Sequence, residues 1–235
     1  RSKLIVFENN GGRATDSDPR ALYEYLKAHP NGYKLLWLAS ADQTERFRSA
    51  ALPYVIKKSL KGIVARARAS FYITNSEVAV NWKKPRGMKV IQTGNGSPLK
   101  KVGTDLSSDF IPGQSIYQYQ KNQVIEGRKW DYLLAGNATA ADLQKNAFRL
   151  GDNQIVMSGL PRIDQLLDMD STKREKIRQE LGITATKRVI LYEPTWRDDE
   201  IVYVDQYGME SKVDFEKLSR SLPKEVEVLD KFPTL

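Results

Sequence analysis

Apolar runs of four to five residues alternate with longer segments of helical pattern along most of the chain. Short apolar runs bounded by turn residues are typical of buried strands, whereas apolar residues three and four apart indicate a helix. The pattern predicts strands at 4–7, 34–38, 71–74, 88–92, 132–135, 154–158, 188–192 and 226–229. It predicts helices at 19–29, 49–69 with a break near Pro53, 139–150, 171–181 and 214–222.

Strands and helices that alternate in this way predict a parallel α/β sheet with helices on both faces. A glycine and a proline in Gly159-Leu160-Pro161-Arg162 interrupt a passage from strand to helix, so we place a domain boundary there. Residues 1–158 then form a complete N-terminal Rossmann-like domain. Residues 159–235 are too few for a second domain of equal size, and we expect them to form the first part of a C-terminal Rossmann-like domain.

The composition is that of a globular protein, with 235 residues, 40% hydrophobic content and 28% charged residues. No apolar run approaches the roughly 20 residues that cross a bilayer. The absence of cysteine excludes disulfides and thiolate metal sites. The net charge of +8 is concentrated in residues 1–105, which hold 19 Lys and Arg against 8 Asp and Glu. A basic first half favours an anionic lipid or polymer partner, and without a nucleic-acid-binding motif we predict no nucleic-acid partner.

The segment Arg46–Arg68 carries seven cations and no acid. Its apolar residues recur at helical spacing and would share one face: Leu52, Ile56, Leu60, Ile63 and Ala67. Two interpretations remain open. The segment is either a helix docked on the sheet with its cations outside, or a basic amphipathic helix that lies on an anionic membrane surface.

A glycine-rich turn follows the apolar run 88–91 and reads Gly94-Asn95-Gly96-Ser97-Pro98-Leu99-Lys100. Ligands of α/β sheets bind beyond the carboxyl ends of the strands, where this turn is expected. Glycines allow a close approach of backbone to ligand, and lysine charge suits phosphate. Polar and cationic residues also stand in Gly159-Leu160-Pro161-Arg162-Ile163-Asp164 and in Tyr192-Glu193-Pro194-Thr195-Trp196-Arg197.

These three segments, together with the end of the first strand at Phe7-Glu8, resemble the CDP-glycerol glycerophosphotransferase family, the polymerases and primases of wall teichoic acid. The turn is similar to the family's Trp-His-Gly-Thr-Pro-Leu-Lys, and the two later segments to Gly-x-Pro-Arg-x-Asp and Tyr-x-Pro-Thr-Trp-Arg. The family's catalytic histidine falls on Asn95. Because an amide accepts no proton near neutral pH, we expect this copy to be impaired or inactive.

The resemblance implies a GT-B-like fold, in which two Rossmann-type domains with parallel sheets enclose a cleft. It implies transfer of glycerol phosphate from CDP-glycerol to the hydroxyl end of a lipid-linked teichoic acid or related capsular polymer, with release of CMP. Such an enzyme works as a peripheral protein on the cytoplasmic face of the plasma membrane. The resemblance implies no metal or other cofactor, and it leaves open a homo-oligomer.

By the same resemblance, Asn95 occupies the catalytic position. Residues expected to bind the donor phosphates or nucleotide are Lys100, Arg162, Thr195 and Arg197. Residues expected on the acceptor side or along the cleft are Glu8, Gly94, Gly96, Ser97, Pro98 and Trp196. Three alternatives remain: a ribitol-phosphate transferase that uses CDP-ribitol, a GT-B glycosyltransferase that uses a nucleotide sugar, and a non-catalytic module that binds anionic membrane or polymer.

Overall fold

The computed structural model describes residues 2–107, 114–184, 189, 201–203, 206–207, 217 and 220. The chain forms two compact units, Arg1–Asp168 and Met169–Leu235, which are described separately below.

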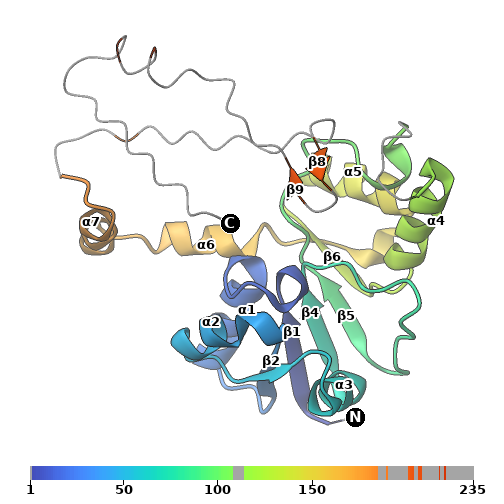
Figure 1. Cartoon of the computed structure of the whole chain (residues 1–235), viewed down its shortest axis with the longest axis horizontal. Helices are drawn as coiled ribbons and strands as arrows, with labels where there is room; N and C mark the ends of the chain where they lie inside the picture. The colour runs from blue at the N-terminus through green and yellow to red at the C-terminus, as the bar shows by residue number, and fades with distance from the viewer. Residues whose placement is uncertain are drawn as a thin grey trace. The chain divides into compact units, whose positions relative to one another are not determined.

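The first unit is built on a parallel sheet of seven strands in the order β3-β2-β1-β4-β5-β6-β7 (Figure 1). The strands are β1 Leu4–Glu8, β2 Lys34–Ala39, β3 Tyr54–Ile56, β4 Phe71–Thr74, β5 Lys89–Gln92, β6 Tyr132–Ala135 and β7 Ile155–Met157. Every pairing between neighbouring strands is parallel. The order reverses between β1 and β4, because the chain first builds the sheet outward from β1 and then returns to its other side. The parallel α/β sheet predicted from the sequence is confirmed.

Alternation along the central strand β1 creates two cores. Ile5 and Phe7 join a cluster with Tyr23 and Trp37, whereas Val6 points to the opposite face and joins Tyr72. Successive side chains of a strand lie on opposite faces, so a strand buried on both sides must be apolar throughout. This explains why the apolar runs were recognisable as strands.

Helices lie in most connections between successive strands and cover the sheet, whereas β4 and β5 are joined without one (Figure 1). The helices are α1 Ser17–Ala28, α2 Thr44–Ser49, α3 Leu60–Arg68, α4 Ile116–Gly127, α5 Ala138–Phe148 and α6 Pro161–Leu167, which follows β7. Side chains cap three of them in the usual way: Ser59, Ser115 and Asn137 each accept a hydrogen bond from a backbone N–H of the first turn. The sequence pattern did not predict α4, whose buried residues are the polar Gln123 and Glu126 together with Gly127.

The prediction of a helix over residues 49–69 with a break near Pro53 was wrong for its first half. The structure has the end of α2, the edge strand β3 and then α3 in this segment. Leu52 is buried in the core, whereas Leu60 and Ile63 are 77% and 54% exposed. Because β3 separates them, the five apolar residues do not share one face. The interpretation of the whole segment as a helix docked on the sheet is therefore wrong as well.

The second unit contains helix α7 (Ser171–Glu180), whose first turn is capped by the carboxylate of Asp170. The predicted helix at 171–181 is confirmed. Strands β8 (Ile201–Tyr203) and β9 (Gln206–Tyr207) form a short antiparallel pair. The predicted elements at 188–192, 214–222 and 226–229 lie almost wholly outside the described residues. A second Rossmann-like domain that begins at residue 159 remains a prediction.

Candidate functional site

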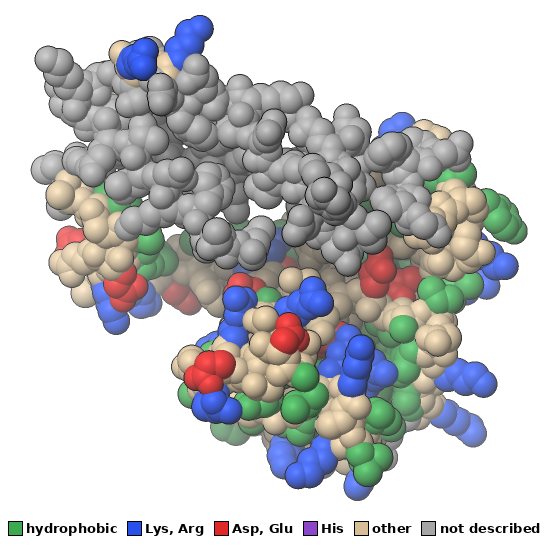
Figure 2. Space-filling model, viewed as in Figure 1, with side chains coloured by type: hydrophobic (Ala, Val, Ile, Leu, Met, Phe, Trp, Pro, Cys, Tyr) green, Lys and Arg blue, Asp and Glu red, His purple; other side chains and the backbone are tan. Residues whose placement is uncertain are grey.

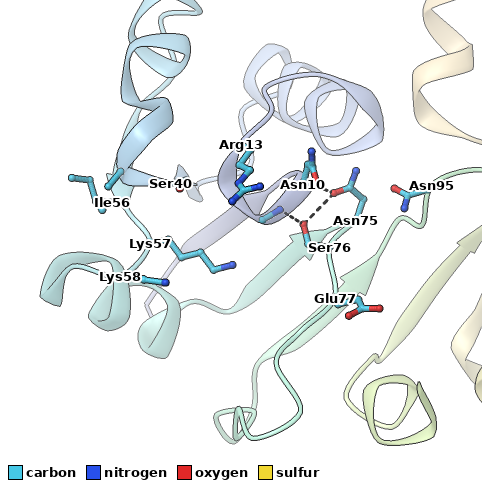
Figure 3. A pocket seen from close by; sticks show the side chains of 12 residues that line it. Asn10, Arg13, Ser40, Ile56, Lys57, Lys58, Asn75, Ser76, Glu77 and Asn95 are labelled. Atoms are coloured by element: carbon cyan, nitrogen blue, oxygen red, sulfur yellow. Dashed lines mark hydrogen bonds between the residues drawn. The ribbon is translucent and has the colours of Figure 1, made fainter. Parts of the chain in front are cut away.

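A cavity of about 710 Å³ opens at the carboxyl edge of the sheet, where the strand order reverses between β1 and β4. This is the position at which open α/β sheets bind ligands. The lining residues come from the ends of five strands: Asn10, Gly11, Arg13, Ser40, Ala41, Ile56, Lys57, Lys58, Asn75, Ser76, Glu77 and Asn95 (Figure 3). Only two of them, Ala41 and Ile56, have apolar side chains, and none is aromatic.

The loop after β1 enters the cavity through a tight turn. Asn10, Gly11 and Gly12 all have positive φ values, at 45°, 65° and 89°. A Cβ on Gly12 would lie 2.8 Å from the backbone nitrogen of Ser40, so no larger residue fits there. The turn brings Arg13 to the cavity, and Figure 3 shows its guanidinium pointing toward the space between the strand ends.

Asparagine and serine side chains tie this turn to the end of β4. The backbone N–H groups of Asn10 and Gly11 donate to Asn75 Oδ1 and Ser76 Oγ at 2.9 Å and 2.6 Å. Asn75 Nδ2 donates to Oδ1 of the buried Asn9 at 2.6 Å. The two loops on either side of the reversal point are therefore fixed relative to one another, which gives the cavity a preformed wall.

A buried carboxylate anchors the opposite wall. Glu8, at the end of β1, is completely buried and accepts hydrogen bonds from Tyr72 Oη at 2.8 Å and from Lys57 Nζ at 2.7 Å. Burial, together with the neighbouring negative charge of Glu8, raises the pKa of Tyr72 well above its usual value, so the phenol stays protonated and donates. Lys57 is thus held at the cavity wall by a charge that lies in the protein interior.

The turn that carries Asn95 reaches the cavity from β5. Gly94 and Gly96 have φ values of 64° and 109°, which only glycine adopts without strain. A Cβ on Gly96 would lie 2.7 Å from Nη2 of Arg162. The structure therefore places the guanidinium of Arg162 beside Gly96, the residue that follows Asn95 in the sequence.

Arg162, near the start of α6, is itself held by the first turn of α1. Its backbone N–H donates to Asp18 Oδ1 at 2.9 Å, and its Nη1 donates to Ser17 Oγ at 2.9 Å. Its Nε lies 3.6 Å from Asp18 Oδ2. Burial raises the pKa of Asp18, while the hydrogen bond and the charge of Arg162 act in the opposite direction. Much of the charge of Arg162 is thus directed toward a carboxylate of the protein.

The other residues selected from the sequence have varied positions. Glu8 does not line the cavity and reaches it only through Lys57. Ser97 Oγ accepts a hydrogen bond from Asn137 at the start of α5, at 3.5 Å. Pro98 is half-buried and Lys100 is exposed, and neither is among the cavity residues. Thr195, Trp196 and Arg197 lie outside the described residues.

Sequence reasoning missed the cations of the cavity as a group. Arg13 and Lys57–Lys58 lie more than 40 positions apart in the sequence, and the lysines were assigned to a helix. The proline at position 53 was the available signal, because it disfavours a helix that continues into Tyr54-Val55-Ile56. Three cations and one acid, Glu77, leave the cavity lining with a net charge of +2.

No group of three or more His, Asp or Glu side chains in the described ranges is arranged to hold a metal ion. In the same part of the chain, every helix is too short or too polar to cross a bilayer.

A seven-stranded parallel sheet with a cationic cavity at its reversal point defines a Rossmann-type ligand-binding domain. The sequence model of the family described as CDP-Glycerol:Poly(glycerophosphate) glycerophosphotransferase matches residues 1–232. The chain belongs to this family, as its three sequence segments indicated.

Curated relatives and solved structures agree with this assignment. A teichoic acid poly(glycerol phosphate) polymerase of Bacillus spizizenii is 34% identical over 95% of this chain and 57% of its own length. A teichoic acid glycerol-phosphate transferase of Staphylococcus aureus is 34% identical over 96% of this chain and 58% of its own. The chain thus spans a little over half the length of these relatives.

The wall teichoic acid polymerase TagF has a structure similar to this chain, with a TM-score of 0.79 and 30% identity over 93% of this chain and 53% of that one. A histidine-to-asparagine variant of that polymerase, soaked with CDPG, gives a TM-score of 0.77 at 29% identity, with the same coverage. These structures confirm the GT-B-like α/β fold class expected from the sequence.

Proposed function

We propose that this chain is part of a glycerophosphotransferase that transfers glycerol phosphate from CDP-glycerol to the hydroxyl end of a lipid-linked polyol-phosphate polymer. The acceptor oxygen attacks the phosphorus that carries glycerol, the bond from this phosphorus to the bridging oxygen breaks, CMP leaves, and the proton of the acceptor hydroxyl passes to water. The observation that carries the proposal is the position of the Asn95 turn, which lies between a cationic cavity and Arg162 in a chain of this family.

In this proposal the first unit holds the acceptor, with its hydroxyl end at Asn95. Lys100, Arg162, Thr195 and Arg197 are the proposed donor-side residues, and they neutralise phosphate charge as the bond breaks. Thermal-shift measurements on the chain test the donor class. We expect CDP-glycerol or CDP-ribitol to raise the melting temperature and UDP-sugars to leave it unchanged. Stabilisation by UDP-sugars alone would instead support a nucleotide-sugar transferase.

In this proposal Asn95 makes the transfer step slower than a histidine would, because its amide cannot accept the proton of the acceptor hydroxyl. General-base catalysis contributes about 100-fold or more, so Asn95→His should raise the rate of CMP release by at least that factor. Asn95→Gln is the matched control, since it also changes the side chain without supplying a base. Equal rates for the original chain and Asn95→His would refute the assignment of a catalytic position to residue 95.

We further propose that α3 docks on an anionic membrane, as a peripheral attachment to the cytoplasmic face of the plasma membrane. Helix α3 combines exposed apolar and cationic side chains: Leu60, Ile63 and Val64 with Lys61 and Arg68. Figure 2 shows apolar and cationic side chains together at the lower end of the view, where Figure 1 places α3. Each cation near an anionic bilayer contributes about 1 kcal/mol, and apolar burial adds to this.

Sedimentation with phosphatidylglycerol vesicles tests the membrane proposal. Leu60→Ser combined with Ile63→Ser should abolish most vesicle binding, because both side chains are more than half exposed and available to lipid. Leu143→Ser, at an exposed apolar position of α5, is the control and should bind normally. Undiminished binding of the double variant, or equal loss in the control, would contradict docking through α3.

A further inference from the structure

The cavity wall that is distant from Asn95 gathers three cations from two loops. Arg13 follows β1, and Lys57 and Lys58 follow the edge strand β3. Figure 3 shows the Arg13 guanidinium and the Lys57 ammonium pointing toward the same space. Arg13 acts electrostatically on the carboxylate of Asp42, but within the described residues neither its side chain nor that of Lys58 forms a hydrogen bond or a close ion pair. The ammonium group of Lys57 donates one of its three N–H groups to Glu8, and the other two can donate to a ligand.

We infer that Arg13, Lys57 and Lys58 form a binding subsite for the phosphodiester of a polyol-phosphate chain, one unit back from the hydroxyl that reacts at Asn95. This inference rests on the proposed function for the identity of the polymer, but the chemistry of the subsite stands on the cavity alone. A guanidinium and two ammonium groups together satisfy the oxygens of a phosphate monoanion, and the arginine fork also fixes its orientation.

The rest of the lining selects the polyol over a nucleotide. The amides of Asn10 and Asn95 supply neutral donors and acceptors, which suit hydroxyl groups, while Asn75 and Ser76 hold the wall in place. No described residue of the cavity lining has an aromatic side chain, so this part of the chain offers a cytosine base no ring on which to stack. A volume of about 710 Å³ lies in the range of small-molecule sites and exceeds the needs of a single phosphate.

Glu8 is a positioning residue in this arrangement. Its carboxylate is fully buried and accepts a hydrogen bond from Lys57 Nζ at 2.7 Å. Because this bond already orders the lysine side chain, ligand binding loses little further side-chain entropy. Glu77, the one acid among the described lining residues, accepts a hydrogen bond from Gln123 Nε2 at 3.3 Å and comes from a different loop than the three cations. The cationic side of the cavity is therefore left to the ligand.

Binding of soluble glycerophosphoglycerol, two glycerols joined by a phosphodiester, tests the inference by titration calorimetry on the chain. Arg13→Gln and Lys58→Gln should each raise the Kd at least fivefold, and the effect should shrink in high salt. Lys34→Gln is the matched control. It removes the same charge from the amino end of β2, the opposite edge of the sheet, and its Kd should stay within twofold. Equal Kd values for all three variants and the original chain, or no binding of the diester at millimolar concentration, would overturn the subsite.

A second arm separates the two sources of a glycerol phosphodiester. If Arg13→Gln weakens binding of the soluble diester but not of phosphatidylglycerol vesicles, the subsite takes the polymer; if both weaken equally, it takes the lipid headgroup. Either result supports the phosphodiester chemistry. Failure of the transferase proposal is distinguishable, because even the Asn95→His variant would then release no CMP while the Arg13 and Lys58 variants still lost diester binding. Conversely, CMP release with an unchanged acceptor KM in Arg13→Gln would overturn the subsite and leave the transferase in place.

Discussion

Replacing Lys57 by methionine tests how the cavity wall is anchored. The substitution keeps an unbranched apolar stem and removes the ammonium that lies 2.7 Å from Glu8 Oε1. The carboxylate of Glu8 has no exposed surface, so it would remain buried with the Tyr72 hydroxyl as its hydrogen-bond donor. An uncompensated buried charge is among the few single changes that destabilise a domain strongly.

The structure allows the size of this effect to be estimated. Removing one partner of a buried ion pair costs about 3–5 kcal/mol in unfolding free energy. The side chain of Lys57 is 28% exposed, and because water screens part of the interaction we discount the cost to about 2–3 kcal/mol. In a Glu8→Gln background no buried charge remains, and the same substitution should cost less than about 1 kcal/mol.

Urea denaturation followed by tryptophan fluorescence measures both values, since Trp37, Trp82 and Trp130 all lie in the first unit. Lys34→Met, at the start of β2, controls for the loss of a lysine from the same sheet. An equal cost of Lys57→Met in the two backgrounds would mean that Lys57 and Glu8 are not coupled, and the account of the cavity wall would be refuted.

Three further predictions concern the supports of the first unit. Burial raises the pKa of Glu126, so the free energy of unfolding should fall as pH rises from about 4.5 toward the folded pKa. Glu126→Gln should flatten this pH dependence of the urea midpoint, and parallel curves for the two proteins would contradict the prediction. For Asp131, burial acts to raise the pKa, but hydrogen bonds from two lysines and a backbone N–H outweigh it and lower the pKa. The stabilisation by Asp131 is present above the unfolded pKa of 3.8 and is lost as pH falls through the folded pKa. Asp131→Asn should therefore lower the free energy of unfolding by about 1–2 kcal/mol at pH 7 and by little near pH 2, as measured by urea denaturation at both pH values. Gly62→Ala would place a Cβ 2.2 Å from the carbonyl oxygen of Ile56. It should lower the free energy of unfolding by about 1–3 kcal/mol in calorimetry. An unchanged melting temperature would show that the β3–α3 loop moves freely.

The sequence contained most of the fold, because parallel strands buried on both faces are continuous apolar runs. Strands β4 and β6 begin and end where the pattern placed them. The edge strand β3 was missed because its three residues stand among leucines and isoleucines whose spacing also fits a helix. Helix α4 was missed for the opposite reason, since its buried side includes an amide and a carboxylate rather than an apolar stripe.

The candidate site was predictable only in part. The turn at Asn95 was found because glycines, a hydroxyl and a lysine follow a strand without interruption in the sequence. Arg13 and Lys57 could not be joined in this way. They meet because β3 is added outside β2 and β2 outside β1, an order that no local pattern encodes. Without the correct assignment of β3, the lysines had no position relative to the cavity.

Arg162 connects three segments. It belongs to α6, binds Asp18 and Ser17 of α1, and lies beside Gly96 of the turn that carries Asn95. Loss of this side chain would allow the backbone at residue 96 to relax and would release a buried carboxylate. A mutational screen scored only by product formation would therefore class Arg162 as chemically essential. The position of residue 95 in an Arg162→Ala variant, determined by crystallography or NMR, would separate the two roles. A displaced residue 95 would mean that Arg162 supports the turn, and an unchanged position would mean that its guanidinium contacts substrate.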